Sequence, residues 1–282
     1  MPIDCHQPLH ILCLTEYIHA CCGAVLGEGR YGVVYQHGSS CALKVVVRPL
    51  QSRSNDTGQG LSEDTEMRIQ SHTQHPALMQ LLAVVQDDVR RGYMFPFAER
   101  GDLMRLIICT GPLEDMNAVT LSLRIASGLQ RLHSLSIAHR DVKPDNILLM
   151  AAAAPFATAV LADFGCASFG SASRSGCTKL TGTFGYWAPE IFAVQAMRRE
   201  SYGYRVDCWA FGISIYPACC GMAPFAGAAS QHEEPRYILD TADFYWLILS
   251  VPVQNTISAL LVVDDARRCS CEEVVESLRG VA

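Results

Sequence analysis

The chain has 282 residues, of which 50% are hydrophobic and 18% are charged. This length and composition allow a substantial apolar core, in one large domain or two lobes, and exclude a wholly disordered chain. The formal net charge of −6 argues against a protein that binds nucleic acid mainly by electrostatics, because no excess of cations is available for the phosphates.

Thirteen cysteines raise the question of disulfides or metal sites. Paired metal-ligand spacing of the CxxC type does not occur in the sequence. What occurs is two adjacent pairs, Cys21-Cys22 and Cys219-Cys220, and one CxC at Cys269 and Cys271. We therefore expect a reducing, intracellular compartment, cytoplasmic or nuclear, in which most cysteines pack as small buried apolar side chains.

Two regions bear on secretion and membranes. The first 20 residues contain two acids, no Lys or Arg and only the short apolar run ILCL, which does not fit a signal peptide. The longest apolar run near the C-terminus, Phe244–Val253, is too short to span a bilayer. We therefore expect a soluble protein without a membrane partner.

The first third of the chain predicts strands. Residues 23–47 combine β-branched pairs with glycine-bearing turns, which is typical of β-hairpins. A polar loop follows, and then a short helix over 62–71 with Ser62 as its N-cap. Strand character returns in 75–85 and 92–97.

Beyond Gly101 the apolar spacing becomes helical. One long amphipathic helix ends near His133, and later helices cover 206–220 and 271–278. A strand-rich first third and a helical remainder predict an α+β protein with a cleft between unequal lobes.

A glycine-rich stretch, Gly27-Glu28-Gly29-Arg30-Tyr31-Gly32, precedes the strand Val33–Tyr35 and the sequence Ala42-Leu43-Lys44. A GxGxxG motif alone also marks dinucleotide-binding turns, in which the third glycine opens a helix. Here a strand is expected instead. Glycines let a backbone approach phosphates closely, and Lys44 supplies a point charge for them.

Lys44 lies in an apolar run, so it needs an anionic partner. The candidates are Glu63 and Glu66 on the predicted short helix, one helical turn apart. Glu66 lies nine residues before His75-Pro76, a spacing that resembles that of the corresponding helix glutamate in protein kinases, so it is the preferred partner and Glu63 is left as a surface charge.

The string His139-Arg140-Asp141-Val142-Lys143-Pro144-Asp145-Asn146 is the most specific motif in the chain. Asp141 fits a carboxylate that orients a hydroxyl and accepts its proton, and Asn146 supplies an amide oxygen for Mg²⁺. Lys143, two residues after the proposed base, can neutralise a phosphoryl group during transfer.

Two further motifs follow in order. Asp163-Phe164-Gly165 comes seventeen residues after Asn146 and follows an apolar strand, which makes Asp163 a second Mg²⁺ ligand. The segment Gly182–Glu190 contains GT, Tyr186 and APE. Thr183 is expected to hydrogen-bond near Asp141 and Lys143.

In these motifs the chain resembles eukaryotic-type serine/threonine protein kinase catalytic domains. The resemblance covers roughly residues 22–279 with every signature in order, and implies one domain over 1–282, with an N-lobe over 22–97, a C-lobe over 98–279 and an ATP cleft between them. The Lys-poor, divergent sequence also resembles kinases of large DNA viruses such as herpesviruses, which would place it in a host cell.

The resemblance assigns site residues. Its catalytic set is Lys44, Glu66, Asp141, Lys143, Asn146, Asp163 and Thr183. Its nucleotide-binding set begins with the residues that cover the phosphates, Leu26, Gly27, Glu28, Gly29, Arg30, Tyr31 and Gly32, and with Lys44, which contacts the phosphates. The purine lies against Val34, Ala42 and Leu148. The gatekeeper is Phe95, the hinge is Pro96, Phe97 and Ala98, and Asp102 binds the ribose.

The resemblance also implies a structural frame. Asp207 matches a buried aspartate that braces the catalytic loop, and Glu190 should pair with an arginine late in the chain. The pattern Asp264–Ser270 nominates Arg268, although Asp265 replaces the usual proline.

Two departures concern regulation. Lys179 stands where many family members carry an activating phosphothreonine, so either Thr178 or Thr181 is phosphorylated instead or the segment is ordered without phosphate. Gln70, four residues after Glu66, occupies a position that is usually apolar, which suggests a mobile helix.

The expected function is transfer of the γ-phosphoryl group of Mg-ATP to Ser/Thr hydroxyls of protein substrates, with an activating kinase or regulatory partner as a further partner. The alternatives are a pseudokinase that acts as a nucleotide-binding scaffold and an oxidoreductase that binds a dinucleotide. A pseudokinase would normally lack Lys44, Asp141, Asn146 or Asp163, and all four are present.

Overall fold

The structure is a computed structural model that describes residues 9–10, 13–29, 32–47, 61–170, 176–225, 237, 239, 241 and 244–281. For residues 9–10, 29 and 61–65 it describes the backbone alone. The chain divides into two compact units, Met1–Ala98 and Glu99–Ala282.

The first unit is built on a six-stranded sheet with the order β1-β5-β6-β4-β3-β2. β1 runs parallel to β5, and the other neighbours are antiparallel. The strands are β1 (Leu9–His10), β2 (Cys22–Gly29), β3 (Gly32–His37), β4 (Cys41–Val47), β5 (Ala83–Gln86) and β6 (Arg90–Pro96). Two helices accompany them, α1 (Leu14–Cys21) and α2 (Leu61–His72).

Helix α1 is anchored to this sheet by its first residue. Leu14 is fully buried with Leu43, Val45 and Val85, and its N–H donates to Asp87 Oδ2 (2.8 Å). Burial would raise the pKa of Asp87, but the hydrogen bonds from Leu14 and two further backbone N–H groups lower it below its usual value. Sequence analysis predicted neither β1 nor α1.

The short central elements differ in detail from their predictions. Helix α2 begins at Leu61, so Ser62 lies inside it and the prediction of Ser62 as N-cap is wrong. Strand structure begins only at Ala83, because residues 76–77 form a turn and only a single bridge, at Leu78, precedes β5.

The segment after the glycine-rich stretch is a strand, which excludes the dinucleotide-binding alternative. β3 starts at Gly32 itself, where that alternative requires a helix. Gly32 has φ of +129°, and a Cβ there would lie 2.2 Å from the Val45 carbonyl oxygen, so only glycine fits.

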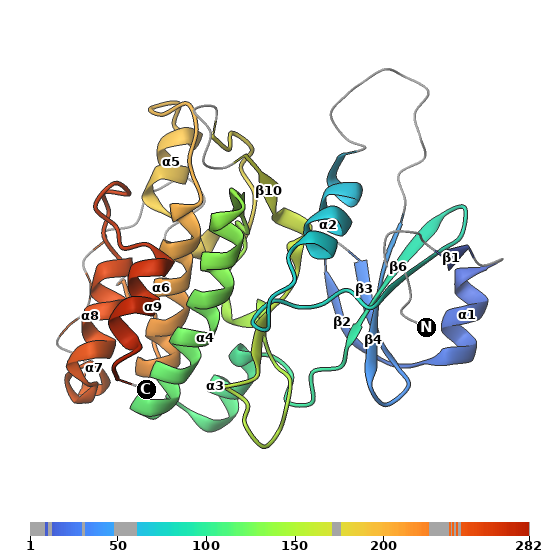
Figure 1. The fold of residues 1–282 in the computed structure, drawn as a ribbon, viewed down its shortest axis with the longest axis horizontal. Helices are drawn as coiled ribbons and strands as arrows, with labels where there is room; N and C mark the ends of the chain where they lie inside the picture. The colour runs from blue at the N-terminus through green and yellow to red at the C-terminus, as the bar shows by residue number, and fades with distance from the viewer. Residues whose placement is uncertain are drawn as a thin grey trace. The chain divides into compact units, whose positions relative to one another are not determined.

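The second unit is mostly helical (Figure 1). Its helices are α3 (Leu103–Thr110), α4 (Asp115–Ser134), α5 (Pro189–Gln195), α6 (Arg205–Cys220), α7 (Phe244–Ile248), α8 (Val251–Leu260) and α9 (Cys271–Leu278). Two small antiparallel ladders complete it, β7 (Ile137–Ala138) with β10 (Ser168–Phe169) and β8 (Ile147–Leu149) with β9 (Ala159–Leu161).

Helices α4 and α6 form the core of this unit. On α4 the side chains of Leu121, Ile125, Leu129 and Leu132 are fully buried, as their helical spacing predicts, whereas Leu123, which we also expect on this apolar face, is only partly buried. α6 is buried along nearly its whole length, which explains why its sequence is apolar on every side. Among the described residues, no helix is both long and apolar enough to cross a membrane.

A buried ion pair ties α5 to the segment before α9. Arg268 is 1% exposed, and its guanidinium donates to both carboxylate oxygens of Glu190, at 2.6 and 2.8 Å. The guanidinium also donates to the Val262 carbonyl (2.9 Å) and lies 5.1 Å from the ring centroid of Trp209. The sequence-based pairing of Glu190 with Arg268 is therefore confirmed.

We expect Glu190→Gln to lower the free energy of unfolding by about 3–5 kcal/mol, because it leaves the Arg268 charge buried without a counter-charge. Asp265→Asn is the matched control: Asp265 pairs with Arg199 at 2.9 Å near the same segment, but the Arg199 side chain is 39% exposed. There we expect a loss of at most about 1 kcal/mol. Urea unfolding of both variants measures the difference, and equal losses would contradict the assignment.

Candidate active site

Lys44 has the anionic partner that its buried position requires. Its Nζ lies 3.0 Å from Glu66 Oε1, and both side chains are about nine-tenths buried. Strand β4 carries the lysine and α2 carries the glutamate. The sequence-based preference for Glu66 is confirmed, and the side chain of Glu63 lies outside the described residues.

The glycine-rich hairpin consists of β2 and β3. Leu26, Gly27, Glu28 and Gly29 end β2, and Gly32 opens β3. Arg30 and Tyr31 at the turn lie outside the described residues. Leu26, Gly27 and Glu28 are exposed. Such a hairpin presents backbone rather than bulky side chains, as a phosphate-covering loop requires.

In the first unit, the residues assigned to the purine and hinge lie on neighbouring strands of the sheet and just after β6. Ala42 on β4 pairs with Phe95 on β6, and Val34 on β3 pairs with Lys44. Phe95 is buried and Pro96 ends the strand. The Phe97 N–H donates to the Ser40 carbonyl (2.8 Å), which fixes the backbone just before Ala98.

Asp102 and Leu148 lie together in the second unit. Asp102 forms an isolated antiparallel bridge with Leu148 on β8. Asp102 is also the N-cap of α3, where its Oδ1 accepts the Arg105 N–H (2.8 Å). A capping carboxylate keeps its second oxygen for another donor, so the cap is compatible with a ribose contact.

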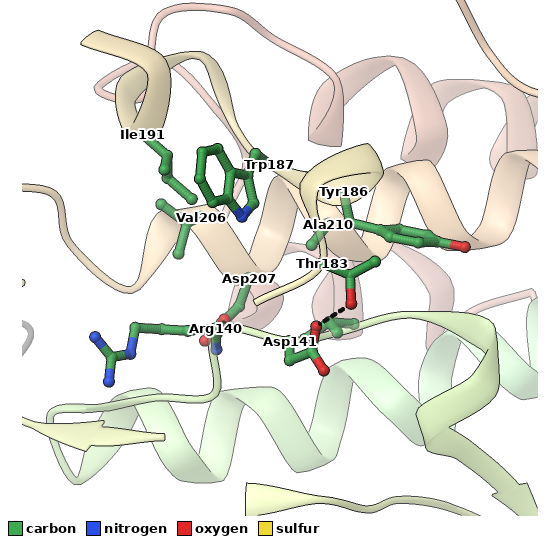
Figure 2. A pocket seen from close by; sticks show the side chains of 10 residues that line it. Arg140, Asp141, Thr183, Tyr186, Trp187, Ile191, Val206, Asp207 and Ala210 are labelled. Atoms are coloured by element: carbon green, nitrogen blue, oxygen red, sulfur yellow. Dashed lines mark hydrogen bonds between the residues drawn. The ribbon is translucent and has the colours of Figure 1, made fainter. Parts of the chain in front are cut away.

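Asp141 is held from several sides (Figure 2). Thr183 Oγ1 donates to its Oδ1 (2.7 Å), Lys143 Nζ lies 3.0 Å from its Oδ2, and Lys143 also donates to Thr183 Oγ1 (2.7 Å). Asn146 Nδ2 donates to both the Asp141 carbonyl (2.7 Å) and its Oδ2 (3.1 Å). The carboxylate therefore has one fixed orientation, as a base that receives a proton requires.

Gly182 allows Thr183 to reach Asp141. It has φ of +89°, and a Cβ there would lie 2.1 Å from the Arg140 carbonyl oxygen. Only glycine permits the activation segment, the chain between Asp163 and Glu190, to approach the catalytic loop, His139–Asn146, this closely.

The buried carboxylate of Asp207 holds the backbone of the catalytic loop, as expected. Its Oδ2 accepts the His139 N–H (2.8 Å) and the His133 Nε2–H (3.0 Å), and its Oδ1 accepts the Arg140 N–H (2.7 Å). Burial would raise the pKa of Asp207, but the hydrogen bond and charge of His133 lower it below its usual value. Burial would lower the pKa of His133, but its hydrogen bond to Asp207 raises it above its usual value.

Asn146 and Asp163 fit a Mg²⁺ site by their donor chemistry. Because the Asn146 amide nitrogen makes both contacts to Asp141, its amide oxygen is the atom left to face a cation. Asp163 adopts φ of +63° and ψ of 81°, and its Oδ1 accepts the Gly165 N–H (3.4 Å). Two oxygen ligands of this kind suit Mg²⁺.

Arg140 holds the activation segment through groups of the chain itself. Its Nε donates to the Cys166 carbonyl (2.7 Å). Burial raises the pKa of both Cys177 and Tyr202, and the charge of the Arg140 guanidinium acts in the opposite direction. Cys177 and Tyr202 also exchange backbone hydrogen bonds of 2.7 and 2.9 Å, so this point of the segment is doubly fixed.

A small hollow adjoins Asp141 and Asp207, lined by Thr183, Tyr186, Trp187 and apolar residues of α5 and α6 (Figure 2). The Trp187 indole donates to the Thr181 carbonyl (2.9 Å). Burial, together with the charges of Asp145 and Asp141, raises the pKa of Tyr186 to about 12. Tyr186 therefore stays neutral beside the acidic loop.

Sequence analysis missed three residues that support this site: His133, Cys166 and Tyr202. Cys166 contributes only its carbonyl to Arg140, which no side-chain pattern can reveal. His133 lies at the predicted end of a helix, six residues before His139, and this short distance along the chain is the sequence feature that indicates a contact with the loop. Tyr202 lies in an irregular segment without periodicity.

Gln70 is the least satisfied buried side chain of α2. It is 4% exposed, and neither its Nε2 nor its Oε1 has a hydrogen-bond partner among the described residues. A buried polar group without a partner costs about 1–3 kcal/mol.

We expect Gln70→Leu to raise the free energy of unfolding by about 1–2 kcal/mol, because leucine removes the unsatisfied amide. Gln86→Leu is the control, since Gln86 is also buried but accepts a hydrogen bond from Arg91 Nε (3.1 Å). That variant should be less stable than the parent. Denaturant unfolding of both measures this, and a Gln70→Leu protein no more stable than the parent would contradict the role given to Gln70.

Curated relatives of the chain are serine/threonine kinases. Serine/threonine-protein kinase DCLK3 of Homo sapiens is 28% identical over 275 residues, which cover 96% of this chain and 41% of the relative. The Aurora kinase of Dictyostelium discoideum is 29% identical over 263 residues, covering 90% of this chain and 63% of the relative. The chain thus spans about two fifths to two thirds of the length of these relatives.

The fold matches the crystal structure of Rad53 1-466 in complex with AMP-PNP, with a TM-score of 0.70 and 22% identity over 92% of this chain and 64% of that one. The protein kinase domain family matches residues 22–278, nearly the whole sequence. The chain therefore belongs to the protein kinase domain family.

Proposed function

We propose that the protein is an ATP-dependent serine/threonine kinase that transfers the γ-phosphoryl group of Mg-ATP to Ser/Thr hydroxyls of protein substrates. The observation that carries this proposal is the network around Asp141, in which Lys143, Thr183 and Asn146 all contact the carboxylate within 3.1 Å. The names of the relatives, serine/threonine-protein kinases, support the same reaction.

The nucleotide contacts follow from the elements that carry them. The backbone of Leu26–Gly29 covers the phosphates, and Lys44, held by Glu66, supplies their counter-charge. Val34, Ala42 and Leu148 contact the purine. The Pro96 carbonyl and the Ala98 backbone bond to adenine, and since only the carbonyl of Pro96 is used, its missing N–H costs nothing there.

In the chemical step Asp141 orients the acceptor hydroxyl and accepts its proton, while Lys143 stabilises the charge that develops on the phosphoryl group. Asn146 and Asp163 would hold Mg²⁺, which would neutralise phosphate charge. The contact of Lys143 with Thr183 supports Ser/Thr rather than Tyr acceptors, because the resemblance links both residues to serine/threonine kinases.

The alternative is a pseudokinase that binds nucleotide and signals by conformation. Lys44 and Glu66 are paired, and Asp141 and Asn146 are hydrogen-bonded to each other, so the machinery is assembled and not merely present. This favours the active enzyme. We further propose that its partners are proteins and that it acts inside the cell.

The first test is transfer of labelled γ-phosphate from Mg-ATP to peptide libraries centred on Ser, Thr or Tyr. The parent should label Ser/Thr peptides, whereas Lys44→Met and Asp141→Asn should each lose about 10²-fold or more of the rate, since each removes a charge used in the transition state. Absence of labelling by the parent, with ATP-dependent thermal stabilisation that Lys44→Met abolishes, would favour the pseudokinase.

We also propose that the activation segment is ordered without phosphate. Arg140 Nε donates to the Cys166 carbonyl, the Arg140 charge acts on the side chains of Cys177 and Tyr202, and the Tyr202 hydroxyl donates to the Lys179 carbonyl (2.5 Å). Thr181 donates its hydroxyl to Cys166 Sγ (3.2 Å). The contacts of Arg140 and Tyr202 serve the ordering role that a phosphate beside Arg140 would have, and the Thr181 contact is not needed for it.

A phosphatase-treated Thr178→Ala/Thr181→Ala protein should keep its activity within about twofold of the parent, because neither hydroxyl is needed as a phosphate acceptor. Tyr202→Phe is the complementary variant: loss of its hydroxyl should lower activity although no phosphosite changes. Peptide phosphorylation rates compare the three. Loss of activity in the double alanine variant, with Tyr202→Phe unaffected, would show that a phosphothreonine orders the segment.

A further inference from the structure

Three side chains of the second unit meet in its core although they are far apart in the sequence. His133 ends α4, Cys208 lies near the start of α6, and Cys271 opens α9. One ligand-type atom of each lies within 4.8 Å of the other two. Cys208 and Cys271 are 0% and 1% exposed, and their sulfur atoms are 3.6 Å apart.

The donor set is of the kind that binds zinc. Thiolate sulfur and imidazole nitrogen are the ligands of structural zinc sites, with Zn–S bonds of about 2.3 Å. In a tetrahedron with such bonds two sulfur atoms lie about 3.8 Å apart. The observed 3.6 Å is close to this edge, so the two thiols need little movement to share one ion.

The histidine has the hydrogen-bonded carboxylate that metal-binding histidines usually have. Its Nε2–H donates to the buried Asp207 carboxylate (3.0 Å), which leaves Nδ1 as the nitrogen for a cation. A carboxylate behind a ligating histidine fixes the ring and raises its basicity. Binding of a metal to such a site releases protons from its ligands.

We propose that His133, Cys208 and Cys271 form a structural zinc site that joins α4, α6 and α9. Cys269, two residues before Cys271, is the candidate for the fourth ligand, and its thiol, which now faces the Ser270 carbonyl (3.3 Å), would have to turn toward the other two. Without a metal, Cys208 and Cys271 would be either two buried thiols in contact or a disulfide.

The position gives the site a consequence for the catalytic loop. Cys208 directly follows Asp207, and Asp207 accepts the backbone N–H groups of His139 and Arg140. Zinc bound here would fix both the histidine that donates to Asp207 and the residue next to it. The proposal does not depend on the kinase activity, because its test reads metal directly.

The test begins with the whole chain, equilibrated with zinc, freed of excess ion and measured for zinc by mass spectrometry. We expect one zinc per chain, and on replacement by Co²⁺ the visible ligand-field and near-ultraviolet charge-transfer absorption of thiolate-bound cobalt. Less than about a tenth of an equivalent after equilibration would overturn the proposal, as would recovery of the two cysteines as a disulfide, because a closed structural site binds its metal stoichiometrically.

Two variants locate the ion. Cys271→Ala should bind zinc at least about tenfold more weakly and lose charge-transfer intensity, because one thiolate is missing. Cys219→Ala is the matched control, since Cys219 is another thiol of α6 with 1% exposure that lies outside the cluster. Equal zinc binding by both variants would overturn the assignment. If Cys271→Ala does not fold, the zinc content of the parent and of Cys219→Ala still decides.

Discussion

The catalytic loop depends on one buried carboxylate. Asp207 is fully removed from solvent, which costs several kcal/mol for a lone charge. The cost is offset because two backbone N–H groups of the loop and the His133 ring all donate to it. These bonds hold Arg140 at φ of +65°, an unusual conformation for a non-glycine residue. Asp141 therefore follows a backbone that is already fixed, and its side chain needs only Thr183, Lys143 and Asn146 to complete its orientation.

The same rule governs the other buried charges: each enters the interior with a partner. Glu190 and Arg268 form a bidentate pair, and Lys44 and Glu66 a single contact. Such pairs add little net stability compared with apolar packing, but removal of one partner leaves an expensive lone charge. They therefore specify which helix meets which strand or loop. The pairs that could be predicted from sequence were those whose residues belong to family motifs in which the spacing between residues varies little.

Most of the correct predictions came from motifs of residues close together in the sequence, and the features that were missed depend on contacts between distant residues. The catalytic residues Asp141 to Asn146 lie within six positions, so their proximity is almost implied by the chain. The helix α1 lacks such a signal, because Asp87, the residue that captures its first N–H, is 73 positions away. The thiols of Cys208 and Cys271 are 63 positions apart and belong to different helices, so a search for short metal-binding spacings could not bring them together. Only packing of the helices does so.

Helix α2 carries two buried polar side chains with opposite effects on its docking. Glu66 gains an ion pair with Lys44 only when the helix lies against β4, whereas Gln70, one turn later, loses its water without gaining a partner among the described residues. Gln70 therefore opposes the docked position that Glu66 and the fully buried Ile69 favour. On the proposed function, nucleotide phosphates bound to Lys44 hold that side chain in place and thereby favour Glu66 and the docked helix. The apolar residue usual at the position of Gln70 would remove the opposing contribution, so this chain relies more on its ligand to order α2 than a chain with leucine there would.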